Sequence, residues 1–277
     1  MRSPADRELL ATAEAAARRA GRLLMRHFGR LKLTQISMKA KNDFVTDIDR
    51  QSERAVISTI VKRFPDHAIQ AEETGDRRGT PETLWIIDPL DGTSNYIHQI
   101  PIFSVSIGVE VRGRRRAGVV YDPVHDELFS ASKGRGAFLN GKRIHATGVT
   151  KLSDALLCTG IPFRARDRFD EYMKSFRTLS LGSVGLRRGG SAALDLAYVA
   201  CGRFDGFWEM DLSPWDIAAG ALLVEEAGGR ITDLWGGTSF MRNGDVLASN
   251  GLIHAEMCRI TKGVFTRVQK DKRWRSV

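Results

Sequence analysis

The stretch WIIDPLDGTSNY at residues 85–96 says most about how this chain folds and where its chemistry lies. An apolar run ends at Asp88, a proline follows, and a second carboxylate, Asp91, comes three positions later. This pattern predicts a buried strand, a turn, and then a helical turn opened by Gly92 and Thr93. Hard divalent cations prefer converging carboxylate oxygens, and phosphate binds the free N–H groups at a helix start. The stretch therefore predicts a metal-dependent phosphoester site.

Taken alone, the same segment could be only a strand, an Asp-Pro turn and a helix cap. Two further acidic motifs favour the metal site. Glu72 and Glu73 follow the short strand-like run at residues 68–71, and Asp216 lies within PWDIAAG at residues 214–220. Asp216 also stands three residues after Ser213, so it can complete a capping box at a helix start, and the two roles can coexist.

The three motifs are Glu72-Glu73, D-P-x-D-G-T at residues 88–93 and W-D-x-A-A-G at residues 215–220. In that order they resemble the inositol monophosphatase family, and residues 190–209 look most like its bacterial inositol-1-monophosphatase subgroup. The resemblance runs from about Asp43 to about Gly251. It implies a layered αβαβα sugar-phosphatase fold of the α+β / α/β class, a homodimer and sensitivity to lithium. Ser94 and Tyr96 stand where the family often has Thr and Phe, and neither is an expected ligand.

The resemblance also implies the metal ligands. One cation would take Glu72, Asp88 and the carbonyl oxygen of Leu90. A second cation would take Asp88, Asp91 and Asp216. Such clustered acids raise each other's pKa until cations relieve the repulsion. No His or Cys lies within the acidic motifs, which disfavours zinc and favours Mg²⁺ or Mn²⁺.

The remaining site residues are carried over from the family pattern in the same way. Glu72, Thr93 and Asp91 form the implied catalytic set, in which Thr93 helps Glu72 to activate the attacking water. The N–H groups of Gly92 and Thr93 would hold phosphate oxygens. Glu209 would accept a hydrogen bond from a substrate hydroxyl. The alcohol side of the pocket would be lined by Gly190, Ser191 and Ala192. Asp49 and Lys39 also fall at family-like positions, with less defined roles.

Composition agrees with a soluble enzyme. The chain has 277 residues and only three cysteines, which favours a reducing compartment over secretion. The first residues lack the apolar core of a signal peptide, and no apolar run is long enough to span a membrane, so we expect a cytoplasmic protein. The net charge of +9 would steer an anionic small-molecule substrate, and it would equally attract RNA.

The apolar periodicity outlines two parts. Residues 1–150 are expected to form an α+β domain with the metal and phosphate motifs, and residues 151–277 an α/β domain that completes the site. In the first part we expect a helix capped by Ser3 and a second helix after Asp49. A half-buried strand should follow at 103–111, with a hairpin at Asn140-Gly141 in a largely antiparallel sheet. In the second part we expect helices at 191–201 and 213–227 around a strand-like run at 203–209. No linker separates the parts.

Two other phosphatase motifs match the sequence only in part, because residues that they require are missing. The haloacid dehalogenase motif D-x-D-G-T needs a nucleophilic Asp where this chain has Pro89. The run from Cys158 to Arg164 fits the cysteine phosphatase pattern C-x5-R. However, Pro162 removes a backbone donor from that loop, and Leu157 replaces the usual His.

Two questions stay open from the sequence. The first is the alcohol, because fructose-1,6-bisphosphate, histidinol phosphate and 3′-phosphoadenosine phosphate are also substrates within this wider resemblance. The second is whether the chain binds RNA or the transcription machinery, with the phosphatase activity secondary. The basic surface permits that second function, but no RNA-binding motif with interleaved aromatic residues is present.

Overall fold

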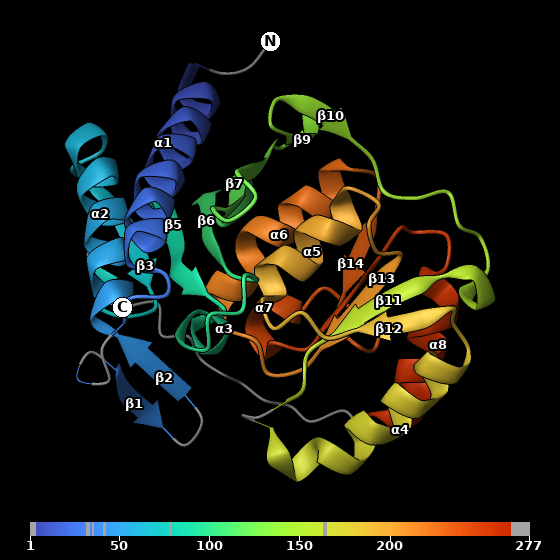
Figure 1. The fold of residues 1–277 in the computed structure, drawn as a ribbon. Coiled ribbons are helices and arrows are strands. Elements are labelled where there is room, and N and C mark those ends of the chain that lie inside the picture. Colours follow the sequence, from blue (N-terminus) through green and yellow to red (C-terminus); the bar gives the residue numbers. More distant parts are fainter. Residues whose placement is uncertain are drawn as a thin grey trace.

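The protein is represented by a computed structural model that describes residues 4–31, 34, 36–40, 43–77, 79–162 and 165–266. Its elements form five layers: helices, a sheet, helices, a second sheet and helices (Figure 1). The first layer is α1 (Pro4–His27) and α2 (Asp47–Arg63), the middle layer is α5 (Ala192–Ala200) and α6 (Pro214–Glu226), and the outer layer is α4 (Phe169–Leu181) and α8 (His254–Val264). The expected layered αβαβα architecture is confirmed.

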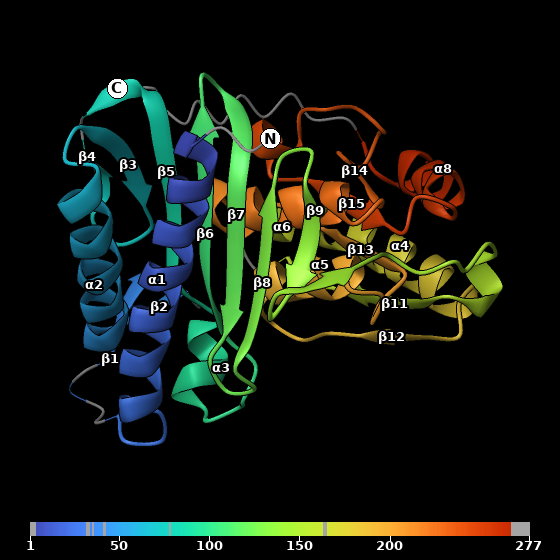
Figure 2. The same ribbon diagram turned by 90° about the horizontal axis from the view of Figure 1, so that it is seen from above.

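The first sheet has eight strands, and Figure 2 shows its strands side by side, with α1 and α2 on one side of the sheet and α5 and α6 on the other. In spatial order they are β10 (Lys142–Ile144), β9 (Gly136–Leu139), β8 (Glu127–Ser132), β7 (Arg114–Asp122), β6 (Ser104–Val111), β5 (Thr80–Asp91), β3 (His67–Ala71) and β4 (Gly75–Arg77). Every neighbouring pair is antiparallel except β3 and β5, as expected for a largely antiparallel sheet. The predicted hairpin joins β9 to β10, where Asn140 and Gly141 take φ values of 48° and 77°.

The second sheet has five strands, of which the sequence patterns predicted only one. Their order is β12 (Gly185–Arg187), β11 (Leu156–Thr159), β13 (Gly206–Glu209), β15 (Val246–Ser249) and β14 (Arg230–Thr232). The first three are parallel and the last two join antiparallel. These strands have three or four residues each, too short to show an alternation in the sequence. A small hairpin of β1 (Ile36–Ala40) and β2 (Asp43–Thr46) lies apart from both sheets.

The expectation that residues 103–111 form a half-buried strand is wrong in one respect. Ser104, Ser106 and Gly108 are buried like the apolar residues between them, so both faces of β6 are covered. The reason is α6, which packs on the face that the sequence suggested was exposed. A side-chain carbon placed on Gly108 would lie 2.6 Å from the Cβ atom of Ala218 in α6. Small residues here permit close packing between the sheet and the helix.

The second helix begins earlier than predicted. α2 starts at Asp47, and Thr46 is its N-cap. The Thr46 hydroxyl accepts the N–H groups of Ile48 and Asp49 at 3.1 and 3.3 Å, while the Asp49 carboxylate accepts the N–H of Thr46 at 2.9 Å. This reciprocal capping box places Asp49 inside the first turn rather than before it. The N-cap predicted at Ser3 lies outside the described residues, but α1 does begin at Pro4.

One hydrophobic cluster crosses the expected domain boundary. Val120 and Phe129 of the first sheet pack with Leu196 of α5 and with Ile217 and Leu222 of α6. The two halves therefore share buried surface, in agreement with the missing linker. A division at residue 150 stays a prediction. Among the described residues, no helix is both long and apolar enough to cross a membrane.

Candidate metal and phosphate site

Three buried carboxylates meet where β5 ends and α6 begins. Oxygen atoms of Asp88, Asp91 and Asp216 all lie within 4.8 Å of one another. In a regular strand, side chains three positions apart point to opposite faces. The pairing of β5 with β6 is irregular between Asp88 and Asp91, around the Pro89 that cannot donate to the ladder. This irregularity lets both carboxylates of the strand face α6.

Backbone and hydroxyl donors orient each of these carboxylates. Asp88 accepts the N–H of Leu90 at 2.9 Å. Asp91 accepts the hydroxyl of Ser191 at 2.6 Å and the N–H of Ala193, in the first turn of α5, at 2.8 Å. Asp216 accepts the N–H of Ser213 at 2.7 Å, within the predicted capping box. All three acids are held by local turns or helix starts, so the cluster is preorganised.

The cluster is electrostatically costly without a counter-charge. Burial raises the pKa of Asp88 well above its usual value, and the charges of Glu72, Asp91 and Asp216 raise it further. Burial and then Asp216 raise the pKa of Asp91 to about 7, although Ser191 and Ala193 oppose the shift. Close carboxylates that supply only oxygen donors fit Mg²⁺ or Mn²⁺ rather than a soft metal. The donor set therefore fits the cation predicted from the sequence.

Glu72 lies beside this cluster but outside the group of three. It follows β3, and its backbone N–H donates to the carbonyl of Ile87 at 3.2 Å, next to Asp88. Its charge contributes to the raised pKa of Asp88 and of Asp49. The carbonyl oxygen of Leu90, the other expected ligand, lies 3.1 Å from the hydroxyl oxygen of Thr93. Ligand roles for Glu72 and Leu90 stay predictions.

The predicted helical turn after Asp91 is present as α3 (Thr93–Ile97). Gly92 caps it with a φ of 96°, and a side-chain carbon there would lie 3.0 Å from the carbonyl oxygen of Ile102. The glycine is thus required by both conformation and space. The Thr93 hydroxyl donates to Asp49 at 3.0 Å, and burial raises the pKa of Asp49 to about 6. Asp49 therefore joins the site, while the side chain of Lys39 lies outside the described residues.

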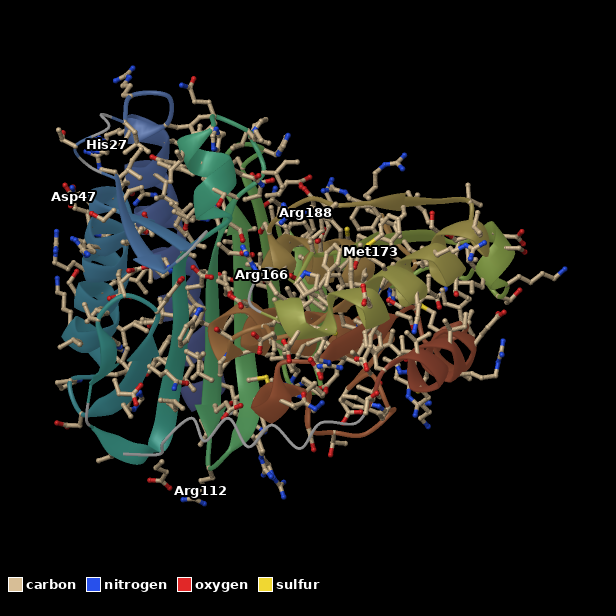
Figure 3. The ribbon with its side chains drawn as sticks, turned by 90° about the horizontal axis from the view of Figure 1, so that it is seen from below. His27, Asp47, Arg112, Arg166, Met173 and Arg188 are labelled. Carbon is tan, nitrogen blue, oxygen red and sulfur yellow. The ribbon has the colours of Figure 1, made fainter. Side chains whose placement is uncertain are left out.

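Glu209 ends β13, within range of the charges of Asp195 and Asp216. Its carboxyl lies so close to Gly160 that a side chain on Gly160 would overlap it. Burial raises the pKa of Glu209 well above its usual value, Asp195 and Asp216 raise it further, and Arg188 opposes them. Arg188 lies where the two halves of the molecule meet (Figure 3). The expected substrate contact of Glu209 stays a prediction, but its place near the acids is established.

The segment 190–192 contributes mainly through Ser191. Its hydroxyl caps α5 by accepting the N–H of Leu194 at 3.4 Å, and it donates to Asp91. Gly190 has a φ of 91°, and a side chain there would collide with Arg188. Ala192 is buried in the cluster between the two sheets. Whether these residues line the alcohol pocket stays a prediction.

Three residues of the site region were not singled out from the sequence. Asp195 is buried in α5, and its pKa is raised by burial and by Asp91 but lowered by Arg188. An acid within the apolar helix AALDLAYVA was a signal that could have revealed it. Asn95 donates to the carbonyls of Ile102 and Gly189 at 2.7 and 2.9 Å, which ties α3 to the segment before α5. Nothing local in the sequence indicated Arg188 or Asn95.

Comparison with known proteins decides the family. The model of the inositol monophosphatase family matches residues 5–264. The chain belongs to this family. Its membership confirms the resemblance of the three acidic motifs and supports phosphatase and hydrolase chemistry. Inositol monophosphatases are in general metal-dependent, in agreement with the buried acidic group.

Individual known proteins align over most of the chain. Nus factor SuhB of Pseudomonas aeruginosa is 48% identical over 247 residues, which cover 87% of this chain and 91% of that protein. Inositol-1-monophosphatase of Mesorhizobium japonicum is 44% identical over 248 residues, which cover 89% of this chain and 93% of that protein. The crystal structure of extragenic suppressor protein suhB from Bartonella henselae superimposes with a TM-score of 0.90 at 40% identity. The match covers 93% of this chain and 100% of that chain.

Proposed function

We propose that this protein is a Mg²⁺-dependent phosphomonoesterase that hydrolyses inositol monophosphate or a related polyol or sugar phosphate. The observation that carries the proposal is the convergence of Asp88, Asp91 and Asp216 beside the hydrogen-bonded pair Thr93 and Asp49. Similarity to a protein named inositol-1-monophosphatase supports the choice of substrate class.

Asp88, Asp91 and Asp216 would hold the cations together with Glu72 and the Leu90 carbonyl. Bound there, Mg²⁺ would neutralise the acids, lower the pKa of a water molecule and stabilise the leaving oxygen. Phosphoryl transfer depends mainly on positioning and on charge neutralisation, so no nucleophilic side chain is required.

The chain's own residues would position the water and the phosphate. A hydroxyl has one proton, and when Thr93 donates it to Asp49 the Thr93 oxygen is left as an acceptor. That oxygen and the Glu72 carboxylate would take hydrogen bonds from the attacking water. The N–H groups of Gly92 and Thr93, at the start of α3, would hold phosphate oxygens. The Glu209 carboxyl would bind a ring hydroxyl on the alcohol side.

A phosphate-release panel tests this function. The substrates are inositol 1-phosphate, fructose-1,6-bisphosphate, histidinol phosphate and 3′-phosphoadenosine phosphate, each with Mg²⁺ and with excess EDTA. We expect the highest kcat/KM for inositol 1-phosphate, complete loss in EDTA, and inhibition by lithium. A higher kcat/KM for another substrate would reassign the alcohol. Full turnover in EDTA would overturn the metal-dependent mechanism.

A second candidate is a transcription-associated function with RNA or a protein partner. It is favoured by 48% identity to a protein named Nus factor SuhB and by the net charge of +9. A catalytically inactive Asp88→Asn protein separates the two functions. RNA binding that weakens steeply with salt and survives this substitution would support the second function, whereas no binding at physiological salt would remove it.

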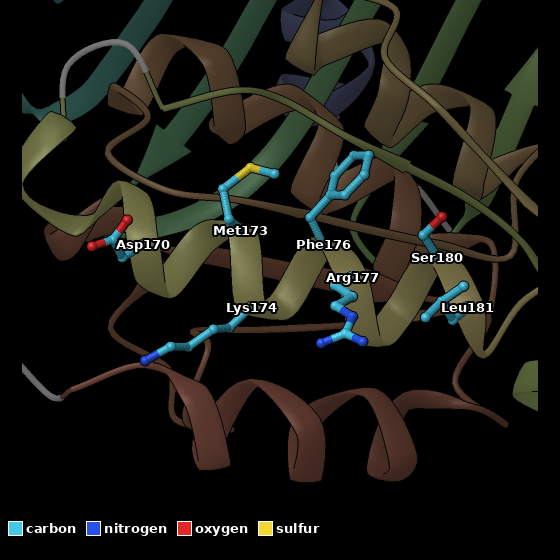
Figure 4. A pocket seen from close by; sticks show the side chains of 7 residues that line it. All are labelled: Asp170, Met173, Lys174, Phe176, Arg177, Ser180 and Leu181. Atoms are coloured by element: carbon cyan, nitrogen blue, oxygen red, sulfur yellow. The ribbon is translucent and has the colours of Figure 1, made fainter.

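The outer face of α4 supports the proposed homodimer. Figure 4 shows Met173, Phe176 and Leu181 along this helix, and Met173 and Leu181 are 43% and 78% exposed. Exposed apolar side chains gathered on one face are typical of an interface. We expect Leu181→Glu to lower the molar mass measured by sedimentation from dimer to monomer. The control Leu252→Glu, at another exposed apolar position, should stay dimeric. A dimer that resists Leu181→Glu would place the interface elsewhere.

A further inference from the structure

A second pocket lies in the outer layer, away from the acidic site. It is a cavity of about 410 Å³ between α8 and the loop that follows β14. Its lining includes Arg230, Gly236, His254, Cys258, Arg259 and Lys262. α8 covers the outer face of the five-stranded sheet, whereas α5 and α6 lie between the two sheets (Figures 1 and 2). The second sheet therefore separates this pocket from the first sheet, which carries Asp88 and Asp91.

Within the part of the chain that the structure describes, the pocket carries three cations without an ion-paired acid. Arg230, Arg259 and Lys262 are exposed at its rim, and among the described residues no carboxylate forms an ion pair with any of them. Many other basic side chains of the structure do have acidic partners, such as Arg168 with Asp245 and Arg203 with Glu127. The three cations thus concentrate positive potential in one concavity, where field lines are focused.

The helix places these groups together. His254, Cys258 and Lys262 follow one another at intervals of four residues, so they share one face of α8, and Arg259 lies beside them. Arg230 comes from the start of β14. The first turn of α8 also borders the pocket, through His254 and Ala255.

The floor of the pocket is fixed and uncharged. One ring nitrogen of His254 lies 2.9 Å from the Thr232 hydroxyl, and the other lies 3.0 Å from the Ser249 hydroxyl. Burial, together with Arg230, lowers the pKa of His254 to about 4, so the ring is neutral at physiological pH. Gly236 has a φ of 82°, and a side chain there would approach Cys258 and Lys262 to 3.0 and 3.4 Å. The bare glycine leaves this side of the pocket open.

We propose that this pocket binds a small phosphorylated ligand, with its phosphate held by Arg230, Arg259 and Lys262. The cations surround one cavity, whereas a groove for a nucleic acid strand would follow the backbone across several nucleotides. The cavity volume falls within the range of small-molecule sites, about 300–1,000 Å³. This binding is separate from the proposed hydrolysis and needs no metal ion.

Calorimetric titration with inorganic phosphate and with adenosine 5′-monophosphate tests the proposal. EDTA is present throughout, because the cation-free acidic site repels phosphate. The pocket variant carries Arg230→Gln, Arg259→Gln and Lys262→Gln. The control carries Arg22→Gln, Arg54→Gln and Lys62→Gln, at three exposed positions of α1 and α2. These substitutions remove the same three positive charges as the pocket variant, but far from the pocket. We expect about tenfold weaker binding, or more, in the pocket variant, and a change below about twofold in the control.

Three outcomes would overturn the proposal. They are no phosphate binding by the unaltered chain, equal weakening in the pocket and control variants, and undiminished binding in the pocket variant. A single-stranded RNA titration covers the remaining alternative. RNA binding that is lost in the pocket variant, without any binding of phosphate or the nucleotide, would assign the cations to RNA. Thermal unfolding of both variants checks that they are folded, and unchanged kcat with inositol 1-phosphate shows that the acidic site is intact.

Discussion

The Thr93 hydroxyl donates a 3.0 Å hydrogen bond to a carboxylate oxygen of Asp49, 44 residues earlier in the chain. Asp49 is itself anchored by the N–H of Thr46 in the capping box of α2. The first turn of α2, which holds Asp49, therefore orients the Thr93 hydroxyl at the start of α3. This connection turns a capping residue into a positioning residue for the proposed chemistry.

Removing the Thr93 hydroxyl should impair catalysis more than binding. We expect Thr93→Val to lower kcat by about 10²–10⁴-fold, the usual contribution of a positioned proton acceptor, with a smaller change in KM. Thr93→Ser keeps the hydroxyl and should retain most activity. Steady-state kinetics with inositol 1-phosphate measures both variants. Equal activity of the Val and Ser variants would show that the hydroxyl takes no part.

Removal of a central ligand should abolish turnover without unfolding the chain. Asp88→Asn keeps the shape of the side chain but removes the charge at the middle of the acidic group. We expect kcat to fall by several orders of magnitude, and the Mg²⁺-induced rise in melting temperature to shrink. Activity assays and thermal unfolding with and without Mg²⁺ measure the two effects. Near-normal activity of folded Asp88→Asn would contradict the proposed ligand set.

The metal-free protein should become less stable as the pH rises from about 4 to 7. Burial and Asp216 raise the pKa of Asp91 to about 7 from its ordinary 3.8, so in this range the folded chain binds a proton that the unfolded chain has lost. The free energy of unfolding therefore falls with rising pH across that window. Asp49, whose pKa is raised by burial to about 6, lowers the free energy of unfolding in the same way between about pH 4 and 6.

The comparison with Asp91→Asn isolates this effect from the rest of the protein's titration. In EDTA, the melting temperature of the variant relative to the unaltered chain should increase from pH 4 to pH 8. Added Mg²⁺ should stabilise the unaltered chain more at pH 8 than at pH 5. A constant difference between the two proteins across this range would mean that Asp91 is ionised normally in the folded state.

Glu209 and Asp216 should separate recognition from chemistry. Glu209→Gln is expected to weaken polyol phosphates by about 1–3 kcal/mol in kcat/KM, the cost of losing a charged hydrogen bond, and to affect an aryl phosphate less. Gly160→Ala should act similarly, because its side chain would displace the Glu209 carboxyl. Asp216→Asn should damage both substrates severely. Equal losses for both substrates with Glu209→Gln would assign that residue to the metal site or to the fold.

Cys158 should be dispensable. It is fully buried in β11, and burial raises the pKa of its thiol well above the ordinary value, so no reactive thiolate is available. Arg164, the other end of the cysteine phosphatase pattern, lies outside the described residues. We expect Cys158→Ser to keep most activity, and alkylation of thiols not to follow inactivation. A folded but inactive Cys158→Ser protein would revive a covalent mechanism.

Sequence patterns predicted best those turns and helix ends that depend only on a few neighbouring residues. The capping box of Ser213 with Asp216 and the Asn140-Gly141 hairpin depend on a few adjacent residues, and both are present. Burial of both faces of β6 was not predictable, because it depends on α6, which is distant in the sequence. Four of the five strands of the second sheet were missed because three or four residues are too few to show an alternation, and such short strands are defined by their neighbours in the sheet.

The sequence by itself determined the identity of the acids and the family of the chain, because residue types and motif order are properties of the sequence. Only the tertiary structure decided how these acids are held. Asp91 takes hydrogen bonds from Ser191 and Ala193, 100 and 102 residues away, and only folding brings these groups together. The basic pocket beside α8 likewise brings Arg230 and Lys262 together, because α8 packs on the outer face of the second sheet. The sequence therefore gives the types of ligand and charge, whereas the distances between these groups arise from contacts between segments that are far apart in the chain.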